Sequence, residues 1–258
     1  MPQPNDDLAE IASLVAEAER ILFITGAGIS ADSGLPTYRG VGGLYEEELT
    51  AEGISIEDAL SGEMLRRHPE ITWKYLAQIE HNCRGAKPNA AHTCIADLER
   101  LVPAVTVFTQ NIDGLHRDAG STDIIEVHGC MRHLHCTRCR YETQVPDYAG
   151  LAIPPRCPEC GAPVRPQVVF FGEALPEEAM ARLFDTLEAG PDLVFSVGTS
   201  SLFPYIAEPV VWARQQGIPT VEINPGRTPL SSLVHFQIPL GAADALGQLH
   251  QLLGQTLD

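Results

Sequence analysis

The sequence contains little lysine and little positive charge. Of its 17 basic residues only Lys74 and Lys87 are lysines, while 34 residues are acidic, so the formal net charge is -17 at pH 7. Such a surface repels a phosphate backbone instead of neutralising it. The composition therefore argues against direct nucleic-acid binding and favours cationic partners.

Membrane-length apolar runs and a targeting pattern are also missing. No apolar run approaches the roughly 20 residues that cross a bilayer. The N-terminal stretch MPQPNDDLAEIA has neither a basic region nor an apolar core. We therefore expect a cytoplasmic protein without membrane contact, and a monomer because no association helix or large apolar stripe is visible. Seven cysteines in that compartment indicate metal binding or thiolate chemistry.

Helical and strand patterns alternate along most of the chain. Buried strands are expected at 21–25, 104–110, 124–129, 192–200, 219–225 and, more weakly, 235–241. Helical spacing is found at 6–20, 90–101, 176–190, 205–217 and 243–255. This alternation predicts an α/β fold with a doubly wound parallel sheet. Two inserts interrupt the pattern, a mainly helical one at about 35–85 and another at about 129–165.

A glycine-rich loop, GAGISADSG, follows the first expected strand. Gly26, Gly28 and Ala31 fit the G-x-G-x-x-G/A pattern that holds a pyrophosphate against a helix N-terminus. A dehydrogenase would continue to a second strand and a ribose-binding acid about 20 residues further on. This chain continues as SGLPTYRGVGGLYEEE, without a strong strand. The loop therefore indicates dinucleotide binding, with an NAD-linked dehydrogenase as a remote alternative.

Two C-x-x-C pairs, Cys136 with Cys139 and Cys157 with Cys160, are separated by seventeen residues. Two such turns supply the four thiolates that tetrahedral zinc prefers, and four thiolates close the coordination shell, so we predict one structural zinc ion. Two alternatives stay open. The cysteines can be small buried hydrophobes, or His133 and His135 can replace some of them as ligands.

Polar residues follow two of the expected strands. Gln110, Asn111 and Asp113 come after AVTVF (104–108), and His128 comes after IIE (124–126). Ligands of open α/β sheets bind where strands end, and a histidine near neutral pH is a candidate general base. The alternative for Asn111 and Asp113 is a helix cap. His116 can be a helix cap or a core hydrogen bonder. Five other histidines are expected on the surface or in the core: His68, His81, His92, His235 and His250.

Seven blocks occur in the order and spacing of the sirtuin family, which comprises NAD-dependent protein lysine deacylases. They are GAGISADSGLPTYRG, TQNIDGLH, the pair His128-Gly129, the two C-x-x-C pairs, VVFFGE, GTSSLFP and EINPG. The resemblance, to prokaryotic members, covers essentially the whole chain. It implies a Rossmann-like large lobe at about 1–34, 86–128 and 166–258, and a small lobe with a helical module at about 35–85 and a zinc ribbon at about 129–165.

The resemblance also implies the chemistry. NAD serves as a co-substrate: the acyl oxygen of an acyl-lysine attacks C1′ of the nicotinamide ribose, and lysine, nicotinamide and 2′-O-acyl-ADP-ribose are the products. His128 would be the base, with Asn111 and Asp113 positioning the ribose, the carboxamide and a water. The implied cofactor contacts are Gly26, Ala27, Gly28, Ser30, Ala31, Tyr38, Arg39, Gln110, Asn111, Ile112, Asp113, Gly198, Thr199, Ser200, Asn224, Pro225 and Ala242. The implied substrate contacts are Val169, Phe170, Phe171, Gly172, Glu173, Leu202 and Phe203.

Two positions depart from family patterns. Many members have phenylalanine where this chain has Tyr38, in the expected flap over the cofactor. Members that prefer succinyl or malonyl groups carry a Tyr-x-x-Arg pair, whereas Tyr75 is followed here by Gln78. Without an arginine fork for a carboxylate, we expect removal of acetyl or other neutral acyl groups. Mono-ADP-ribosyl transfer and a catalytically idle zinc-ribbon module that binds NAD are the alternative functions.

Overall fold

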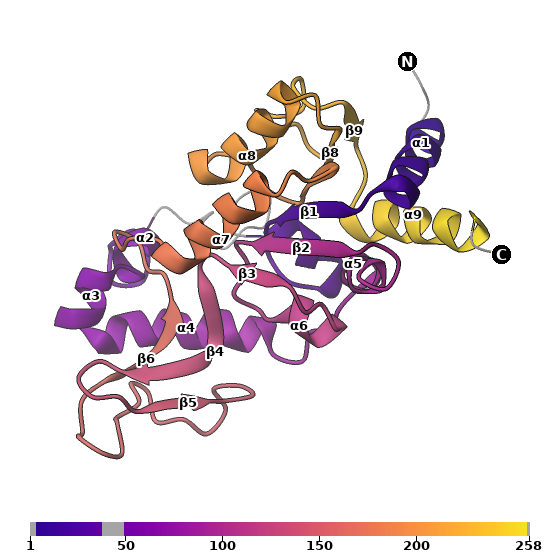
Figure 1. Ribbon diagram of the computed structural model, residues 1–258. Helices are drawn as coiled ribbons and strands as arrows, with labels where there is room; N and C mark the ends of the chain where they lie inside the picture. Colours follow the sequence, from indigo (N-terminus) through magenta and orange to yellow (C-terminus); the bar gives the residue numbers. More distant parts are fainter. Residues whose placement is uncertain (1–3, 38–48, 257–258) are drawn as a thin grey trace.

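The computed structural model describes residues 4–37 and 49–256 (Figure 1). Tyr38 and Arg39, which were expected to form the flap, lie outside the described residues. The described residues form two β-sheets, and the larger of the two is entirely parallel. Its strand order is β3 (Ile124–Glu126), β2 (Ala104–Thr109), β1 (Arg20–Thr25), β7 (Leu193–Val197), β8 (Thr220–Ile223) and β9 (Phe236–Ile238). The predicted doubly wound parallel sheet is therefore confirmed.

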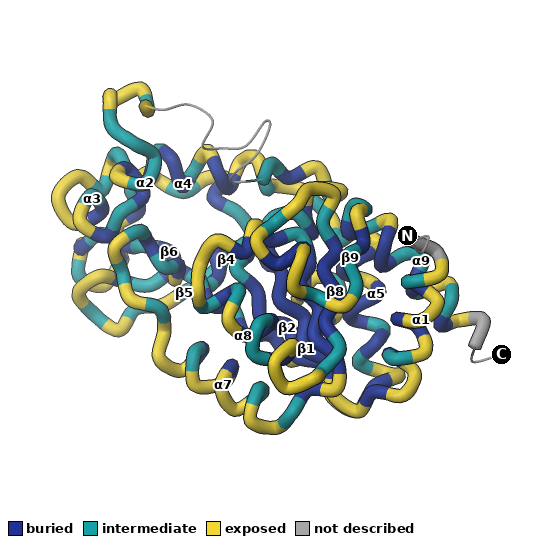
Figure 2. The backbone as a smooth tube through the Cα atoms, turned by 90° about the horizontal axis from the view of Figure 1, so that it is seen from above, coloured by how far each residue is buried: buried dark blue, intermediate teal, exposed yellow. Residues whose placement is uncertain are grey.

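Helices cover both faces of this sheet (Figure 1). One face carries α1 (Pro4–Glu17), α5 (Ala90–Leu98) and α9 (Ala242–Thr256). The other carries α7 (Glu177–Glu188) and α8 (Pro204–Gln215). Side chains alternate along a strand, so Phe23 of β1 belongs to the first core while Leu22 and Ile24 belong to the second. Figure 2 shows β1 and β2 as buried strands between these layers.

A further core forms where two distant stretches of sequence meet. It combines helices α2 (Ile56–Ala59), α3 (Gly62–Arg67) and α4 (Pro69–Cys83) with a three-stranded antiparallel sheet. The strand order of that sheet is β5 (Glu142–Gln144), β4 (Gly129–Cys136) and β6 (Val164–Val168). Trp73 of α4 is fully buried here and its indole N–H donates to the Val164 carbonyl at 2.9 Å.

The three strands of the small sheet and helix α3 were not predicted. Strand β4 reads GCMRHLHC, in which polar and charged residues interrupt the apolar positions. Its partners β5 and β6 have only 3 and 5 residues. Such short, polar strands carry a weak periodic signal, because their pairing is set by contacts from elsewhere in the chain.

Gly129 allows β4 to begin directly after His128. Its φ is +78°, and a Cβ atom there would lie 1.9 Å from the carbonyl oxygen of Gln167 in β6. Only glycine fits this left-handed conformation and this close approach. The two residues of the His128-Gly129 pair therefore lie at the junction of the two sheets.

None of the described helices has both the length and the apolar character needed to span a membrane.

The difference in burial between two phenylalanines predicts how their replacement changes the free energy of unfolding. Phe23 is fully buried and stacks on Phe195 with ring centroids 4.5 Å apart, while Phe184 of α7 is 59% exposed. Phe23→Ala should lower the free energy of unfolding by about 3–5 kcal/mol, and Phe184→Ala should change it by less than about 0.5 kcal/mol. Urea denaturation of both variants measures this difference, and equal effects would contradict the assigned burial.

Candidate functional site

The candidate site lies where the strand order reverses between β1 and β7. The loop after β1 enters a short 3₁₀ helix, η1 (Ala27–Ser33), and touches the loop after β7. The Gly28 N–H donates to the Gly198 carbonyl at 2.8 Å, and a Cβ atom on Gly28 would lie 2.6 Å from the Gly198 Cα. The close contact between these two loops is therefore the reason that the loop GAGISADSG needs its glycines. Ligands of open α/β sheets bind at this kind of switch point.

Three polar side chains meet beside this loop contact. Asn111, from the loop after β2, donates to the Gly26 carbonyl at 3.1 Å and to the Ser30 hydroxyl at 3.2 Å. The Ser30 hydroxyl donates in turn to Asp113 Oδ2 at 2.8 Å. Asn111 and Ser30 are buried, and Asp113 is half-buried. The structure therefore brings these three predicted residues together.

Asp113 has two roles in the local structure. Its Oδ1 accepts a hydrogen bond from the backbone N–H of Leu115 at 2.9 Å, at the start of α6 (Leu115–Ala119). Its other oxygen faces Ser30. Burial raises the pKa of the Asp113 carboxyl, while the hydrogen bonds from Leu115 and Ser30 oppose that rise. The N-cap residue of α6 is Gly114 and no side chain caps the helix, so neither Asn111 nor Asp113 is its cap; Asp113 Oδ1 orders the turn before the helix, and Oδ2 belongs to the Ser30 network.

His128 is held from both sides of its ring. Nδ1 lies 2.9 Å from the Gln110 carbonyl oxygen and Nε2 lies 2.8 Å from the Tyr205 hydroxyl. A carbonyl oxygen can only accept, so Nδ1 carries a proton, and in the neutral ring Nε2 has the lone pair that a general base needs. Burial lowers the pKa of His128, and the Gln110 carbonyl opposes this shift. Burial therefore favours the neutral imidazole.

A second group of predicted residues lies beside β7 and β8. Gln110 donates from its side-chain amide to the Thr199 hydroxyl at 3.1 Å, and Asn224 donates to the Thr199 carbonyl at 3.0 Å. Thr199 is buried, whereas Ser200 and Pro225 are exposed. Ala242 is buried at the first position of α9, and Ala31 is exposed on η1. Thr199, Ser200, Asn224 and Pro225 follow the carboxyl ends of β7 and β8, and the Gln110 side chain reaches Thr199 from the end of β2.

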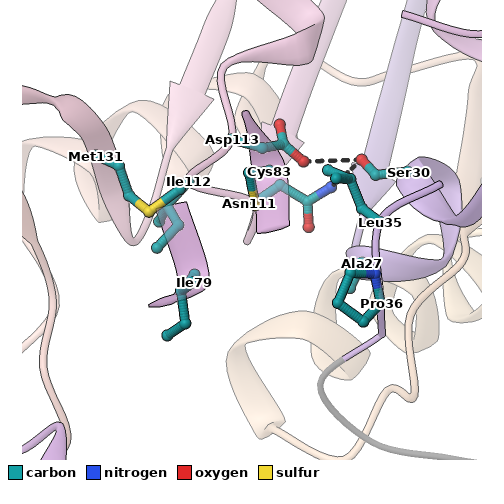
Figure 3. A pocket seen from close by; sticks show the side chains of 10 residues that line it. All are labelled: Ala27, Ser30, Leu35, Pro36, Ile79, Cys83, Asn111, Ile112, Asp113 and Met131. Carbon is teal, nitrogen blue, oxygen red and sulfur yellow. Dashed lines mark hydrogen bonds between the residues drawn. The ribbon is translucent and has the colours of Figure 1, made fainter. Parts of the chain in front are cut away.

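A cavity opens next to the Ser30 network (Figure 3). Figure 3 shows Met131, Ile112 and Ile79 across the cavity from Ala27 and Pro36. Its apolar wall belongs to the core shared by α4 and the small sheet, and the loops after β1 and β2 supply the rest. The lining residues are Ala27, Ser30, Leu35, Pro36, Ile79, Cys83, Asn111, Ile112, Asp113 and Met131. Sequence reasoning missed the apolar wall from α4 and β4. The only pattern in the sequence that pointed to this wall was the apolar spacing of α4, and the same spacing also predicts ordinary packing in a hydrophobic core.

Cys83 in this wall is not a candidate nucleophile. Burial raises the pKa of its thiol to about 12, so the thiolate is not formed near neutral pH. Cys94 is fully buried in α5 and belongs to the core on that face of the large sheet. His116 is also buried, and its Nε2 lies 3.0 Å from the Thr25 hydroxyl, as expected for a core hydrogen bonder. Burial lowers the pKa of His116 to about 3.

The predicted substrate segment, residues 169–173, runs from β6 toward the turn between α2 and α3. The Phe171 N–H donates to the Leu60 carbonyl at 3.0 Å. Glu173 accepts from Arg165 at 2.7 and 2.8 Å and from the Phe170 N–H at 3.0 Å. This charge-assisted anchoring holds Val169, Phe170, Phe171, Gly172 and Glu173 as one ordered segment. Leu202 and Phe203, after β7, are 55% and 38% exposed.

The four paired cysteines converge at the end of the small sheet. Their sulfur atoms all lie within 4.8 Å of one another, with Cys136 to Cys160 at 3.4 Å and Cys139 to Cys157 at 3.5 Å. Sulfurs around tetrahedral zinc lie about 3.8 Å apart for a Zn–S distance of about 2.3 Å. The cluster therefore fits one structural zinc ion. His133 Nε2 lies 2.9 Å from the Gln144 side chain instead, and neither His133 nor His135 belongs to the cluster.

Comparison with known proteins places this geometry in a family. A family model described as "Sir2 family" matches residues 26–203, more than half of the chain. The chain belongs to the Sir2 family. A Sir2 relative from Pseudomonas aeruginosa named NAD-dependent protein deacylase 2 is 50% identical over 95% of this chain and 96% of its own length. A Pseudomonas syringae pv. tomato protein of the same name is 48% identical over 94% and 98%.

Solved Sir2 structures have the same fold. A Sir2 homologue mutant in complex with ADP-ribose superposes with a TM-score of 0.87 at 32% identity, covering 96% of this chain and 97% of that one. A Sir2 homologue in complex with NAD gives a TM-score of 0.85 at 33% identity, covering 96% and 94%. The expected Rossmann-like architecture of the Sir2 family is thereby confirmed.

Zinc binding can be tested directly. We expect one zinc ion per chain in the purified protein, and its loss in Cys139→Ser, because three thiolates leave the tetrahedral shell incomplete. The ribbon should then unfold, since metal binding supplies the stability of such small modules. Elemental analysis and limited proteolysis measure both effects. Cys94→Ala, a cysteine change in the distant α5, should keep its zinc, and full zinc retention in Cys139→Ser would overturn the assignment.

Proposed function

We propose that the protein is an NAD-dependent protein lysine deacylase. It converts an acyl-lysine and NAD to lysine, nicotinamide and 2′-O-acyl-ADP-ribose. The observation that carries this proposal is the ring of His128, whose Nδ1 donates to the carbonyl of Gln110, the residue before Asn111 of the network with Ser30 and Asp113. The Sir2 membership and the deacylase names of the relatives support it.

Each group of residues in the site has a different proposed role. His128 would accept a proton at Nε2 from a ribose hydroxyl of NAD. Asn111 and Asp113 would orient the ribose and the carboxamide, and the apolar wall around Ile112 would exclude water. Such a site gains rate from positioning and from fixed polar groups more than from a strong nucleophile. Bound NAD supplies the electrophilic ribose carbon and the nicotinamide leaving group.

The remaining predicted contacts are proposed on the same basis. The loop from Gly26 to Ala31 would hold the pyrophosphate and ribose, and Tyr38 with Arg39 would form the flap over the cofactor. Thr199 and Asn224 would face the adenosine. The segment 169–173 would add a strand to an extended acyl-lysine peptide, opposite Leu202 and Phe203. The net charge of -17 supports lysine- and arginine-rich protein substrates over nucleic acid.

His128→Ala should abolish the acyl transfer. We expect kcat for an acetyl-lysine peptide to fall about 10²- to 10⁴-fold, which is the usual contribution of a general base. Mass spectrometry of the peptide and the nucleotide products distinguishes the alternatives. Wild-type protein should release nicotinamide and acyl-ADP-ribose in equal amounts. A peptide that gains ADP-ribose would point to the transferase, NADH to a dehydrogenase, and no turnover by the wild type to an idle binding module.

We also infer a preference for neutral acyl groups. Gln78 is exposed on α4, and the nearby cation Lys74 is paired with Glu52 at 2.6 Å, while the Tyr75 hydroxyl donates to the same carboxylate. No cation of this described cluster is left for an acyl carboxylate.

A peptide series tests that preference. The value of kcat/KM should be at least about tenfold higher for acetyl- than for succinyl-lysine, because a buried carboxylate without a partner costs at least that much. A neutral acyl group of the same chain length as succinyl separates charge from size. The preference is refuted when succinyl is removed faster than that neutral group.

A further inference from the structure

Tyr205 contacts His128, although no sequence motif singled it out. It is the second residue of α8 (Pro204–Gln215) and is half-buried. Its hydroxyl oxygen lies 2.8 Å from His128 Nε2, and the two rings meet edge to face with centroids 6.1 Å apart. The Phe203 ring stacks on the Tyr205 ring at 5.6 Å, with an angle of 20° between the planes. Ring packing on two sides therefore holds the hydroxyl against the imidazole.

The direction of this hydrogen bond follows from the other ring nitrogen. Nδ1 must donate to the Gln110 carbonyl, so in the neutral ring Nε2 has only a lone pair, and the Tyr205 hydroxyl donates to it. When the imidazole takes up a proton, Nε2 becomes a donor. A hydroxyl can turn and accept that bond, whereas a carbonyl cannot reverse its role. Tyr205 is thus able to partner both protonation states of His128.

The other groups that face His128 are backbone groups or uncharged. Gln110 contributes its carbonyl from the end of β2, and the Val169 N–H donates to the His128 carbonyl at 3.0 Å from the end of β6. Tyr205 is the titratable side chain that α8 contributes. Burial raises the pKa of Tyr205, so it keeps its proton. Within the described part of the chain, no charged side chain contributes to the lowered pKa of His128.

We propose that Tyr205 is a positioning residue for His128, donating a hydrogen bond to Nε2 of the neutral ring in the free protein and accepting one from Nε2–H once the ribose proton has been taken up. In that step the ribose O–H bond breaks and the Nε2–H bond forms. Tyr205 keeps its own hydroxyl proton and turns it away from the ring. The first half of this proposal rests on geometry alone, and the second half rests on the proposed deacylase function.

The substitution Tyr205→Phe removes the side-chain hydroxyl and tests its contribution alone. The substitution keeps the ring that packs against Phe203 and His128, so the fold should be preserved, which thermal denaturation checks. A hydrogen bond to a charged imidazolium is stronger than one to the neutral ring. Removing the hydroxyl should therefore lower the pKa of His128 by about one unit. An NMR titration of ¹⁵N-histidine-labelled protein measures it without NAD, with the His128 signal assigned from its absence in His128→Ala.

Kinetics with acetyl-lysine peptide and NAD test the second half. In Tyr205→Phe the acidic limb of the pH profile of kcat/KM, which reports the base of the free enzyme, should move to lower pH. We expect kcat to fall about tenfold, as for a lost hydrogen bond to a charged group, with less than a twofold change in KM for NAD. Tyr141→Phe, the same chemical change in the ribbon, should move neither quantity.

The outcomes separate the two proposals. An unchanged His128 titration in Tyr205→Phe overturns the positioning role, whatever the activity. A shifted titration in a protein whose wild type has no deacylase activity keeps the positioning of the imidazole and sinks the deacylase function. A shifted titration with an unchanged kinetic profile overturns the role of Tyr205 in the reaction.

Discussion

The contact between the loop after β1 and the loop after β7 is the constraint on which the site depends. The Gly28 N–H reaches the Gly198 carbonyl, and a Cβ atom on Gly198 would lie 2.3 Å from the Ile29 nitrogen. Two backbones can approach this closely only when neither carries a side chain. The approach sets where η1 begins, and η1 carries Ser30 to the side chains of Asn111 and Asp113.

Buried polar groups at this point must be satisfied, and that requirement orders the site. Ser30 connects an amide to a carboxylate, and Asn111 also satisfies the Gly26 carbonyl. An unpaired polar group in the same place would cost about 1–3 kcal/mol. The network therefore has few alternative arrangements. His128 is fixed in a similar way, because the Gln110 carbonyl and the Tyr205 hydroxyl saturate both nitrogens.

Much of this arrangement could be predicted from the sequence. Strands β1, β2, β7 and β8 are short apolar runs, and helices α1, α5, α7 and α9 have a clear helical period, so local signals sufficed. The paired spacing of the cysteines brought four ligands to one point, as the cluster shows. Polar residues that follow neighbouring strands had to meet, because parallel strands end at one edge of the sheet.

Other features depend on contacts that no local pattern encodes. Strand β4 pairs with β6 from a more distant part of the chain, and β4, β5 and β6 all carry polar residues, so their strand propensity is weak. Ile79 and Met131 form one cavity wall only because α4 and β4 share a core. The sequence by itself determined the strands of the large parallel sheet with the helices that cover it, the four cysteines of the cluster and the polar residues of the site. Tertiary packing alone decided the cavity wall and the tautomer of His128, because Tyr205 and Gln110 meet that ring only when α8 and β2 are packed together.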